Sequence, residues 1–241
     1  MGLKESGLRG SLRNVSVDID AIPDSAIYWW NPSNFDSAGW DDEVQEETMS
    51  IEGLEASTFV DGSDSVEAEN PEDLGEADIM EDIIRESFTI EFELETNDSS
   101  SEPYIFGGFA DGPDDFFMVS LNADASRNSD DGNIVFRFRD ASGSRTRFAF
   151  DNAPDLNDGD LHTVTVAIND LENGDVDLYF DGESKDEDVD STGADPDNFG
   201  DIDLTRFGVM GRFSDDENLE DGITGNIGIL AIHDEAVEPT I

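Results

Sequence analysis

The sequence NDGDLHTVTVAI at residues 157–168, followed by DVDLYFDGES at residues 175–184, decides the fold of this chain. In both segments apolar residues alternate with polar ones, which is the period of a β-strand with one buried face. Asp-Gly pairs at residues 158–159 and 181–182 favour tight turns between antiparallel strands. The two segments therefore predict a β-hairpin. The apolar residues of that hairpin are Val164, Val166, Ile168, Val176, Leu178 and Phe180.

The same alternation extends in both directions along the chain. Apolar residues recur at every second position in residues 90–94 and 227–231, and Asp-Gly or Asn-Gly pairs separate such runs. Residues 76–85 are the one segment with helical spacing, and we expect a short helical connector there. About ten to fourteen short strands with regular turns predict an all-β fold, an antiparallel β-sandwich.

The N-terminal residues differ from this pattern in charge. Lys4, Arg9 and Arg13 are three of the 12 cationic residues, and an alternating apolar pattern follows at residues 12–19. We expect residues 1–26 to form an extended arm, an anchor or oligomerisation segment, and residues 27–241 to form the sandwich. An ordinary edge strand of the same sandwich is the alternative for the arm.

Composition places strong limits on partners and habitat. The chain has 241 residues, 36% of them hydrophobic, and a formal charge of -49 from 61 acidic and 12 basic residues. Such a surface excludes ordinary nucleic-acid binding. At ~1 M salt the Debye length falls to roughly 3 Å, so the self-repulsion is screened. Because the acids are spread along the chain and lysine is nearly absent, we interpret it as a halophile's protein. The alternative is an acidic calcium-storage protein.

Several functional classes lack their sequence signals. The chain has no cysteine, so disulfides, thiolate metal sites and a cysteine nucleophile are excluded. No apolar run approaches the ~18 residues of a membrane span, and the start has no signal-peptide core. We therefore expect no membrane insertion, and either retention where the chain is made or release as part of an assembly.

The quoted hairpin resembles the paired strands of a laminin G or concanavalin A type jelly roll, with Leu161 where that family usually has Trp. Other segments resemble the family's further motifs and follow its order. These segments are FVDGSD at residues 59–64, FTIEFEL at residues 88–94 and GNIGILAI at residues 225–232. The resemblance covers roughly residues 27–236 and implies a jelly-roll sandwich.

Residues 7–25 are similar to leaders that precede such sandwiches in virion proteins of tailed viruses infecting haloarchaea. This similarity implies a non-enzymatic virion structural protein, namely a turret, decoration, head fibre or tail fibre subunit, assembled in the host cytoplasm. The expected partners are further copies of the chain, other virion proteins and a host cell-surface glycan or glycoprotein. The alternative is a haloarchaeal glycan-active enzyme, or a secreted lectin or adhesin, with the same sandwich.

The strongest enzyme-like signal is the run Glu91, Glu93 and Glu95, which places three carboxylates on one strand face. Some glycosidases with this sandwich use an E-x-D-x-E strand, in which carboxyls ~5 to 5.5 Å apart suit a retaining mechanism. With 61 acids, however, such a run is expected on any solvated face. We expect no catalytic residue there, and we expect His162 to be a structural histidine.

The family resemblance also implies a calcium site. Laminin G type domains often bind calcium at the rim, and position by position this implies Asp115 as a ligand, with Asp203 and the carbonyl of Asp140 nearby. Because Ca²⁺ takes six to eight oxygen ligands, about three protein contacts plus waters would suffice. Calcium is the only cofactor that we expect.

Arginine is concentrated in one segment. Arg137, Arg139, Arg145 and Arg147 are four of ten arginines, and phenylalanines alternate with them, which predicts a hairpin with one aromatic and one guanidinium face. These arginines either neutralise carboxylates on adjacent strands, or bind an acidic neighbouring subunit or an acidic or sulfated glycan. The aromatic group Tyr28, Trp29, Trp30, Phe35 and Trp40 is expected in the core or at an interface.

Overall fold

A computed structural model describes most of the chain. The described residues are 22–45, 48–78, 87–100, 103–109, 116–121, 134–139, 145–150, 156–170, 175–185, 189–191, 206–213, 219–220 and 222–241. They form 19 strands in antiparallel pairs, which confirms the all-β class and exceeds the number expected from the sequence. Within these ranges the structure has no helix that is long and apolar enough to cross a membrane.

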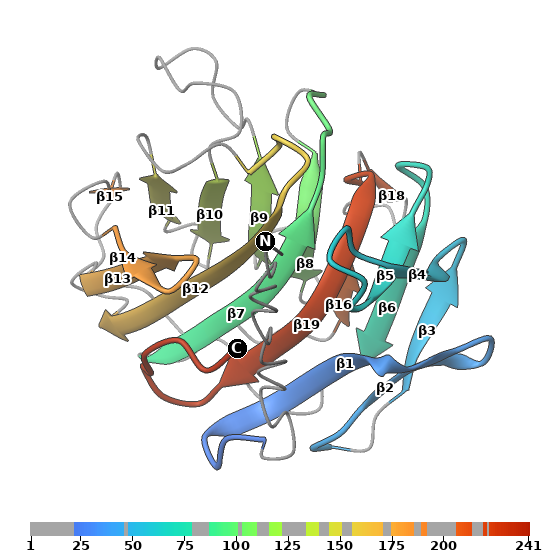
Figure 1. The fold of residues 1–241 in the computed structure, drawn as a ribbon. Coiled ribbons are helices and arrows are strands. Elements are labelled where there is room, and N and C mark those ends of the chain that lie inside the picture. The colour runs from blue at the N-terminus through green and yellow to red at the C-terminus, as the bar shows by residue number, and fades with distance from the viewer. Residues whose placement is uncertain are drawn as a thin grey trace, which may run out of the picture.

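One layer, here called sheet A, is built around the central strand β7 (Figure 1). Its strands, in order across the layer, are β14 (Glu183–Ser184), β13 (Asp175–Phe180), β12 (Leu161–Asp170), β7 (Phe88–Glu95), β19 (Gly225–His233) and β1 (Ala26–Asp36). β5 (Asp64–Ala68) also pairs with β19, and β4 (Glu55–Thr58) pairs with β5. β2 (Gly39–Asp42) continues the layer beyond β1.

The second layer, sheet B, stacks against the first (Figure 1). Its strands, in order, are β15 (Val189–Ser191), β11 (Arg145–Phe150), β10 (Ile134–Arg139), β9 (Phe116–Leu121), β8 (Tyr104–Phe109), β16 (Arg206–Val209), β6 (Leu74–Asp78) and β3 (Thr48–Glu52). The pairing of β2 with β3 joins the two layers at one edge. A separate pair is formed by β17 (Arg212–Phe213) and β18 (Leu219–Glu220).

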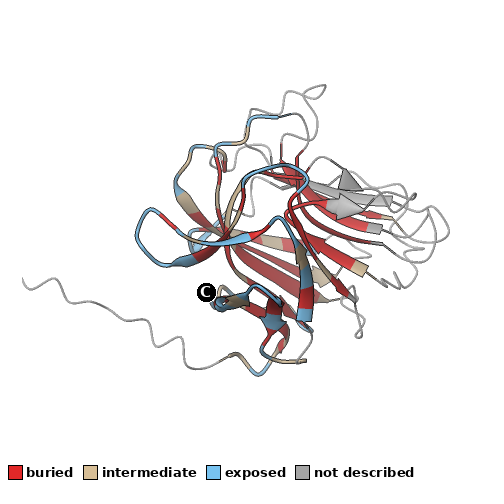
Figure 2. Cartoon of the chain, turned by 90° about the vertical axis from the view of Figure 1, so that its right-hand side faces the viewer, coloured by how far each residue is buried: buried red, intermediate tan, exposed pale blue. Residues whose placement is uncertain are grey.

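The core lies between the two sheets and is rich in aromatic rings. The Phe92 ring of sheet A meets Phe106 of sheet B edge to face at 5.1 Å between centroids. Trp30 of β1 also contacts the opposite sheet, because its ring stacks on Phe207 of β16 with 5.9 Å between centroids. Most buried residues lie on the strands, and the exposed ones lie mainly on the connections (Figure 2). Because each fully buried large apolar side chain contributes about 1.5–3 kcal/mol, this interior can hold the sandwich without disulfides.

The hairpin predicted from residues 157–184 is confirmed. Val164 pairs with Phe180 and Val166 with Leu178, and all four side chains are buried in the core. The turns on either side of the hairpin use glycine where the backbone needs it, since Gly159 before β12 has a φ of 85° and Gly182 after β13 a φ of 75°.

Two sequence predictions are wrong in detail. The helical connector expected at residues 76–85 begins as a strand, because residues 76–78 pair with β16 and Glu76 also pairs with β3. Residues 79–86 lie outside the described part. The simple alternation expected at residues 227–231 is also broken, because a register shift in β19 between Ile227 and Leu230 places both of these side chains in the core.

Candidate functional site

The arginine-rich hairpin forms as predicted at the level of the backbone. In the antiparallel pair β10–β11, Arg137 lies opposite Arg147 and Arg139 opposite Arg145. Phe136 and Phe138 alternate with the arginines of β10 and are buried in the core. Since alternate residues of a strand point to opposite faces, Arg137 and Arg139 belong to the outer face of sheet B, where both are half-buried. For Arg145 and Arg147 the structure describes the backbone only.

A further arginine, which the sequence analysis missed, lies in the same row of sheet B. From β16 to β10 the residues opposite one another are Arg206, Phe109, Phe116 and Arg139. Residues directly opposite in antiparallel pairs share a face, so Arg206 lies on the outer face with Arg137 and Arg139. Arg206 and Arg139 are three strand spacings apart, or about 14 Å. We call Arg137, Arg139 and Arg206 the arginine face.

Carboxylate residues of β6 lie on the same outer face, since Asp78 is directly opposite Arg206 and Glu76 is two residues earlier in the strand. Arg206 Nε lies 3.6 Å from Glu76 Oε1, and the side chains remain 42% and 32% exposed. An ion pair of this length and exposure contributes little to stability. Arg206 therefore keeps donors that a planar anion could use. The alternative in which arginines neutralise carboxylates on adjacent strands is realised at Arg206 by this long pair.

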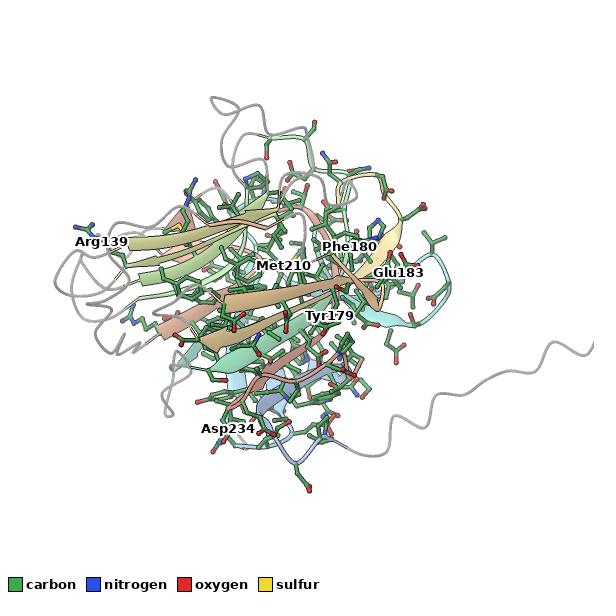
Figure 3. The ribbon with its side chains drawn as sticks, turned by 90° about the vertical axis from the view of Figure 1, so that its left-hand side faces the viewer. Arg139, Tyr179, Phe180, Glu183, Met210 and Asp234 are labelled. Atoms are coloured by element: carbon green, nitrogen blue, oxygen red, sulfur yellow. The ribbon has the colours of Figure 1, made fainter. Side chains whose placement is uncertain are left out.

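Charge is distributed unequally between the two sheets. In the described strands each arginine lies in sheet B or in β17, and the strands of sheet A contain neither arginine nor lysine. In Figure 3 Arg139 lies at the end of its strand, at the left edge of the view, and Asp234 lies at the lower edge. In a chain with a net charge of -49, the strands of sheet B therefore carry the cations of the described sandwich strands, beside the carboxylates of β6.

The three carboxylates of β7 are on one face, as predicted, but the first of them is not solvated. Glu91 is fully buried, and its Oε2 lies 3.0 Å from His233 Nε2. Thr165 Oγ1 donates to Glu91 at 2.9 Å and Thr240 N at 2.7 Å, and Ser25 Oγ lies 3.0 Å from His233 Nδ1. The expectation of a solvated face is therefore wrong at Glu91, because the C-terminal residues cover the centre of sheet A.

The other two carboxylates also accept backbone or side-chain hydrogen bonds. Glu93 Oε2 accepts from Ile229 N at 3.0 Å, inside the register shift of β19. Glu95 accepts from Val60 N at 3.0 Å and from Asn226 Nδ2 at 3.2 Å. Glu91, Glu93 and Glu95 thus each accept hydrogen bonds that hold neighbouring segments of the fold together.

The protonation of Glu91 and Glu93 is shifted in opposite directions. Burial raises the pKa of Glu91, but hydrogen bonds from His233 and Thr240 and the charge of His233 outweigh it, so its pKa is lowered. Burial also raises the pKa of Glu93. There the bond from Ile229 N only partly compensates, and the nearby charge of Asp61 adds to the increase, so its pKa stays raised. The cause of the contrast is the number of donors that face each carboxylate.

His162 has the structural role that the sequence analysis expected of it. Its Nδ1 lies 3.0 Å from Asp181 Oδ2, its Nε2 lies 3.1 Å from Asp158 Oδ1, and the ring packs against Phe180. Burial lowers the pKa of His162, but the hydrogen bonds and charges of Asp181 and Asp158 outweigh it, so its pKa is raised. The ring thereby ties together the two turns that flank β12 and β13.

The aromatic residues near the start of the sandwich belong to the interior. Tyr28, Trp30 and Trp40 are fully buried in the main core, and Trp29 lies in a second apolar cluster with Ala231 on the outer side of sheet A. The core alternative for these residues is confirmed. These four rings are covered by protein, so they offer no platform for stacking on a sugar.

The calcium ligands implied by resemblance cannot be placed. Asp115, Asp140 and Asp203 all lie outside the described residues, and the calcium site stays a prediction. Within the described part, no group of three or more His, Cys, Asp or Glu side chains is arranged to hold a metal ion.

Comparison with known proteins identifies the domain type. The family model that matches residues 55–240 is described as the concanavalin A-like lectin/glucanases superfamily. No curated protein matches the chain.

Solved structures share the fold at low sequence identity. The botulinum neurotoxin serotype D binding domain aligns over 88% of the chain with a TM-score of 0.59 and 14% identity. Domain 4 of AbnA, a GH43 extracellular arabinanase from Geobacillus stearothermophilus, solved with arabinotriose, aligns over 88% of the chain and 93% of its own length with a TM-score of 0.57 and 15% identity. The chain spans only 48% of the length of the neurotoxin structure.

Proposed function

The chain belongs to the concanavalin A-like lectin/glucanases superfamily, and on this basis we propose that it is a non-enzymatic adhesion module whose arginine face binds acidic glycans. The observation that carries the proposal is the placement of Arg137, Arg139 and Arg206 on one outer face of a sheet in a strongly anionic chain. Guanidinium groups bind carboxylate and sulfate through paired hydrogen bonds, which compact ammonium groups cannot reproduce.

Two of the structural neighbours support a glycan as the class of ligand. The arabinanase domain was solved with arabinotriose. Another neighbour is a structure of botulinum neurotoxin type C, with a TM-score of 0.58 and 13% identity. Cell entry of that toxin depends on interaction with two ganglioside molecules. Fold likeness does not transfer a ligand, so the arginine face has to be tested by itself.

The acidic-glycan proposal is tested by binding in concentrated KCl. The ligands are a sulfated oligosaccharide and its desulfated form, and the variants are Arg137→Gln with Arg139→Gln, and Lys185→Gln as a control. Lys185 is a cation beyond β14 of sheet A, paired with Glu183 at 3.2 Å. We expect the double arginine variant to lose affinity for the sulfated form by about tenfold or more, because each charge-assisted bond contributes about 1.5–3 kcal/mol. Equal affinity of the double variant and the wild type would contradict the proposal.

The non-enzymatic part of the proposal has its support in β7. Glu91, Glu93 and Glu95 form the run that resembles a glycosidase strand, and each one accepts a structural hydrogen bond. A general acid or nucleophile needs a carboxyl that reaches the substrate, whereas Glu91 is fully buried. Glycan hydrolysis by the wild type that disappears in a folded Glu95→Gln variant would contradict this part.

The finer proposal is a surface subunit of a haloarchaeal tailed virus, present as a homo-oligomer beside other virion proteins. The acidic composition fits brine, and residues 7–25 are similar to leaders of such virion proteins. Mass spectrometry of purified particles from a halophilic host should detect the chain at a fixed ratio to the capsid protein. Its absence from particles, with abundance in the cell, would contradict the virion role and leave the glycan proposal standing.

A further inference from the structure

A polar cavity opens on the outer side of sheet A, away from the arginine face. Its volume is about 780 Å³, and it lies where the end of β1, the start of β5, β7 and β19 meet. Its polar lining includes Asn31, Ser33, Asn34, Glu43, Asp64 and Glu93. Ile22, Pro32 and Ile229 add apolar surface. This volume is within the roughly 300–1,000 Å³ typical of small-ligand sites.

Glu93 provides the cavity with a carboxyl held in a fixed position. Its Oε2 is occupied by the bond from Ile229 N at 3.0 Å. For Oε1 the described residues supply no hydrogen-bond partner, and the half-buried Glu93 side chain lines the cavity. Because burial raises the pKa of Glu93, the group carries its proton to higher pH than an ordinary glutamate does. Glu93 is therefore able to accept a hydrogen bond from a ligand hydroxyl, or to donate one as acidity increases.

The opposite wall is ordered by its own hydrogen bonds. Asn34 Nδ2 donates to Glu43 Oε1 at 2.9 Å, and Ser33 N donates to Asn31 Oδ1 at 3.0 Å. Both bonds are exposed to solvent, so they restrain Ser33 and Asn34 only in part. A partly restrained wall loses less conformational entropy on binding than a free one.

We propose that this cavity binds one residue of a neutral, hydroxyl-rich sugar. A sugar ring presents several hydroxyl donors to the carboxylates of Glu43, Asp64 and Glu93, and its C–H face can lie on the partly exposed apolar surface of Ile22 and Ile229. The same carboxylates repel acidic glycans, which go to the arginine face instead. The inference rests on the proposed function only in assuming that glycans are the ligands of this protein. The cavity itself is lined by residues outside sheet B.

The test is saturation-transfer NMR in concentrated KCl with methyl α-glucopyranoside and methyl α-galactopyranoside as probes. The site variants are Asn34→Ala and Glu93→Gln, and the matched control is Glu95→Gln. Gln at position 93 keeps an oxygen that can accept from Ile229 N, so the variant is expected to fold. Glu95 lies two residues further along the same strand and lines a different cavity of about 500 Å³. Near-ultraviolet circular dichroism checks that all three variants fold.

We expect saturable binding of at least one probe, an affinity loss of about tenfold in each site variant and no change in Glu95→Gln. Absence of binding, or binding unchanged in both site variants, would overturn the inference. Loss of neutral-sugar binding in Arg137→Gln with Arg139→Gln would also overturn it, because the sugar would then belong to the arginine face. If the sulfated glycan does not bind while the neutral sugars bind as expected, the proposed function is refuted and the inference about the cavity remains.

Discussion

At the scale of single residues, the most consequential group is the buried pair of Glu91 and His233. Both side chains are fully buried and lie 3.0 Å apart. Ser25 forms a hydrogen bond with His233, and Thr240 donates one to Glu91. A buried ion pair contributes little net stability when intact, but removing one partner leaves an uncompensated polar group. The network therefore makes the domain depend on one carboxylate at the centre of sheet A.

Glu91→Ala should lower the free energy of unfolding by about 3–5 kcal/mol, because His233, Thr165 and Thr240 lose their common partner. Urea unfolding in concentrated KCl measures it. Glu55→Ala is the control, since Glu55 is exposed on β4, and its effect should stay within about 0.5 kcal/mol. A loss at Glu91 as small as the loss at Glu55 would show that the pair is not what holds the C-terminal residues.

His162 predicts a pH dependence. Its pKa is raised above the ordinary 6.5, so the protonated ring stabilises the fold fully below that value, and the contribution is lost as the pH rises through the raised pKa. Melting temperatures of the wild type, measured from mildly acidic to mildly alkaline buffers at constant KCl, should therefore fall with pH above the ordinary value. His162→Gln should be less stable at the acidic end and should lack this slope. An identical slope in the variant would assign the effect to other groups.

The roles of some single residues could be predicted from the sequence, and those of others could not. The structural role of His162 followed from its place in the hairpin motif. The burial of Glu91 did not follow, because it depends on Thr240 and His233, which lie far away in the sequence. Arg206 was missed for the same reason, since only strand register places it beside Arg139.

At the scale of elements, the register shift in β19 is the feature that shapes the polar cavity. Gly228 lies inside it, and a Cβ at this position would come within 2.2 Å of Glu93 Oε2 and 2.8 Å of Phe59 Cε2. The glycine thus leaves room for the Glu93 carboxylate to reach Ile229 N. A bulge of this kind redirects the strand and commonly accompanies functional sites.

Gly228→Ala should destabilise the protein by about 1–3 kcal/mol, because the new methyl group must displace the Glu93 carboxylate or the Phe59 ring. The measurement is a double-mutant cycle with Glu93→Ala, using urea unfolding in KCl. Once the carboxylate is removed, the methyl group should cost less, so the two losses should not add. Strict additivity would mean that Gly228 and Glu93 do not share this space.

Element types were predicted well from the sequence, whereas register was not. Alternation and Asp-Gly turns located the strands of the hairpin and the arginine-bearing strand β10. The shift within β19 left the apolar pattern at residues 227–231 looking regular, and residues 76–78 had helical spacing that sheet pairing overrode. Both errors arise because pairing partners far away in the sequence decide local conformation.

At the scale of the whole molecule, the net charge of -49 makes the fold depend on salt. At about 0.01 M salt the Debye length is about 30 Å, so repulsion acts across the sandwich, and at about 1 M it is about 3 Å. We expect the melting temperature to rise steeply with KCl and the chain to unfold in dilute buffer. Circular dichroism across a KCl series measures this, and a stable sandwich in nearly salt-free water would contradict the halophilic interpretation.

The sandwich and its family could be recognised from the amino-acid sequence, because an acidic exterior does not disturb the apolar alternation. The unequal charge of the two sheets could not, since it depends on which strands share a layer. Arg137 and Arg139 were visible as a cluster, but their relation to Arg206 and their separation from the strands of sheet A required the topology.

The measurement that tests the central claim most directly is NMR of the arginine Nε–Hε groups during titration with a sulfated oligosaccharide in concentrated KCl. The account predicts saturable shifts at Arg137, Arg139 and Arg206, with backbone changes confined to β8, β9, β10 and β16 of sheet B. Shifts centred on β7, β12 or β13 of sheet A, with the arginine signals unmoved, would contradict it.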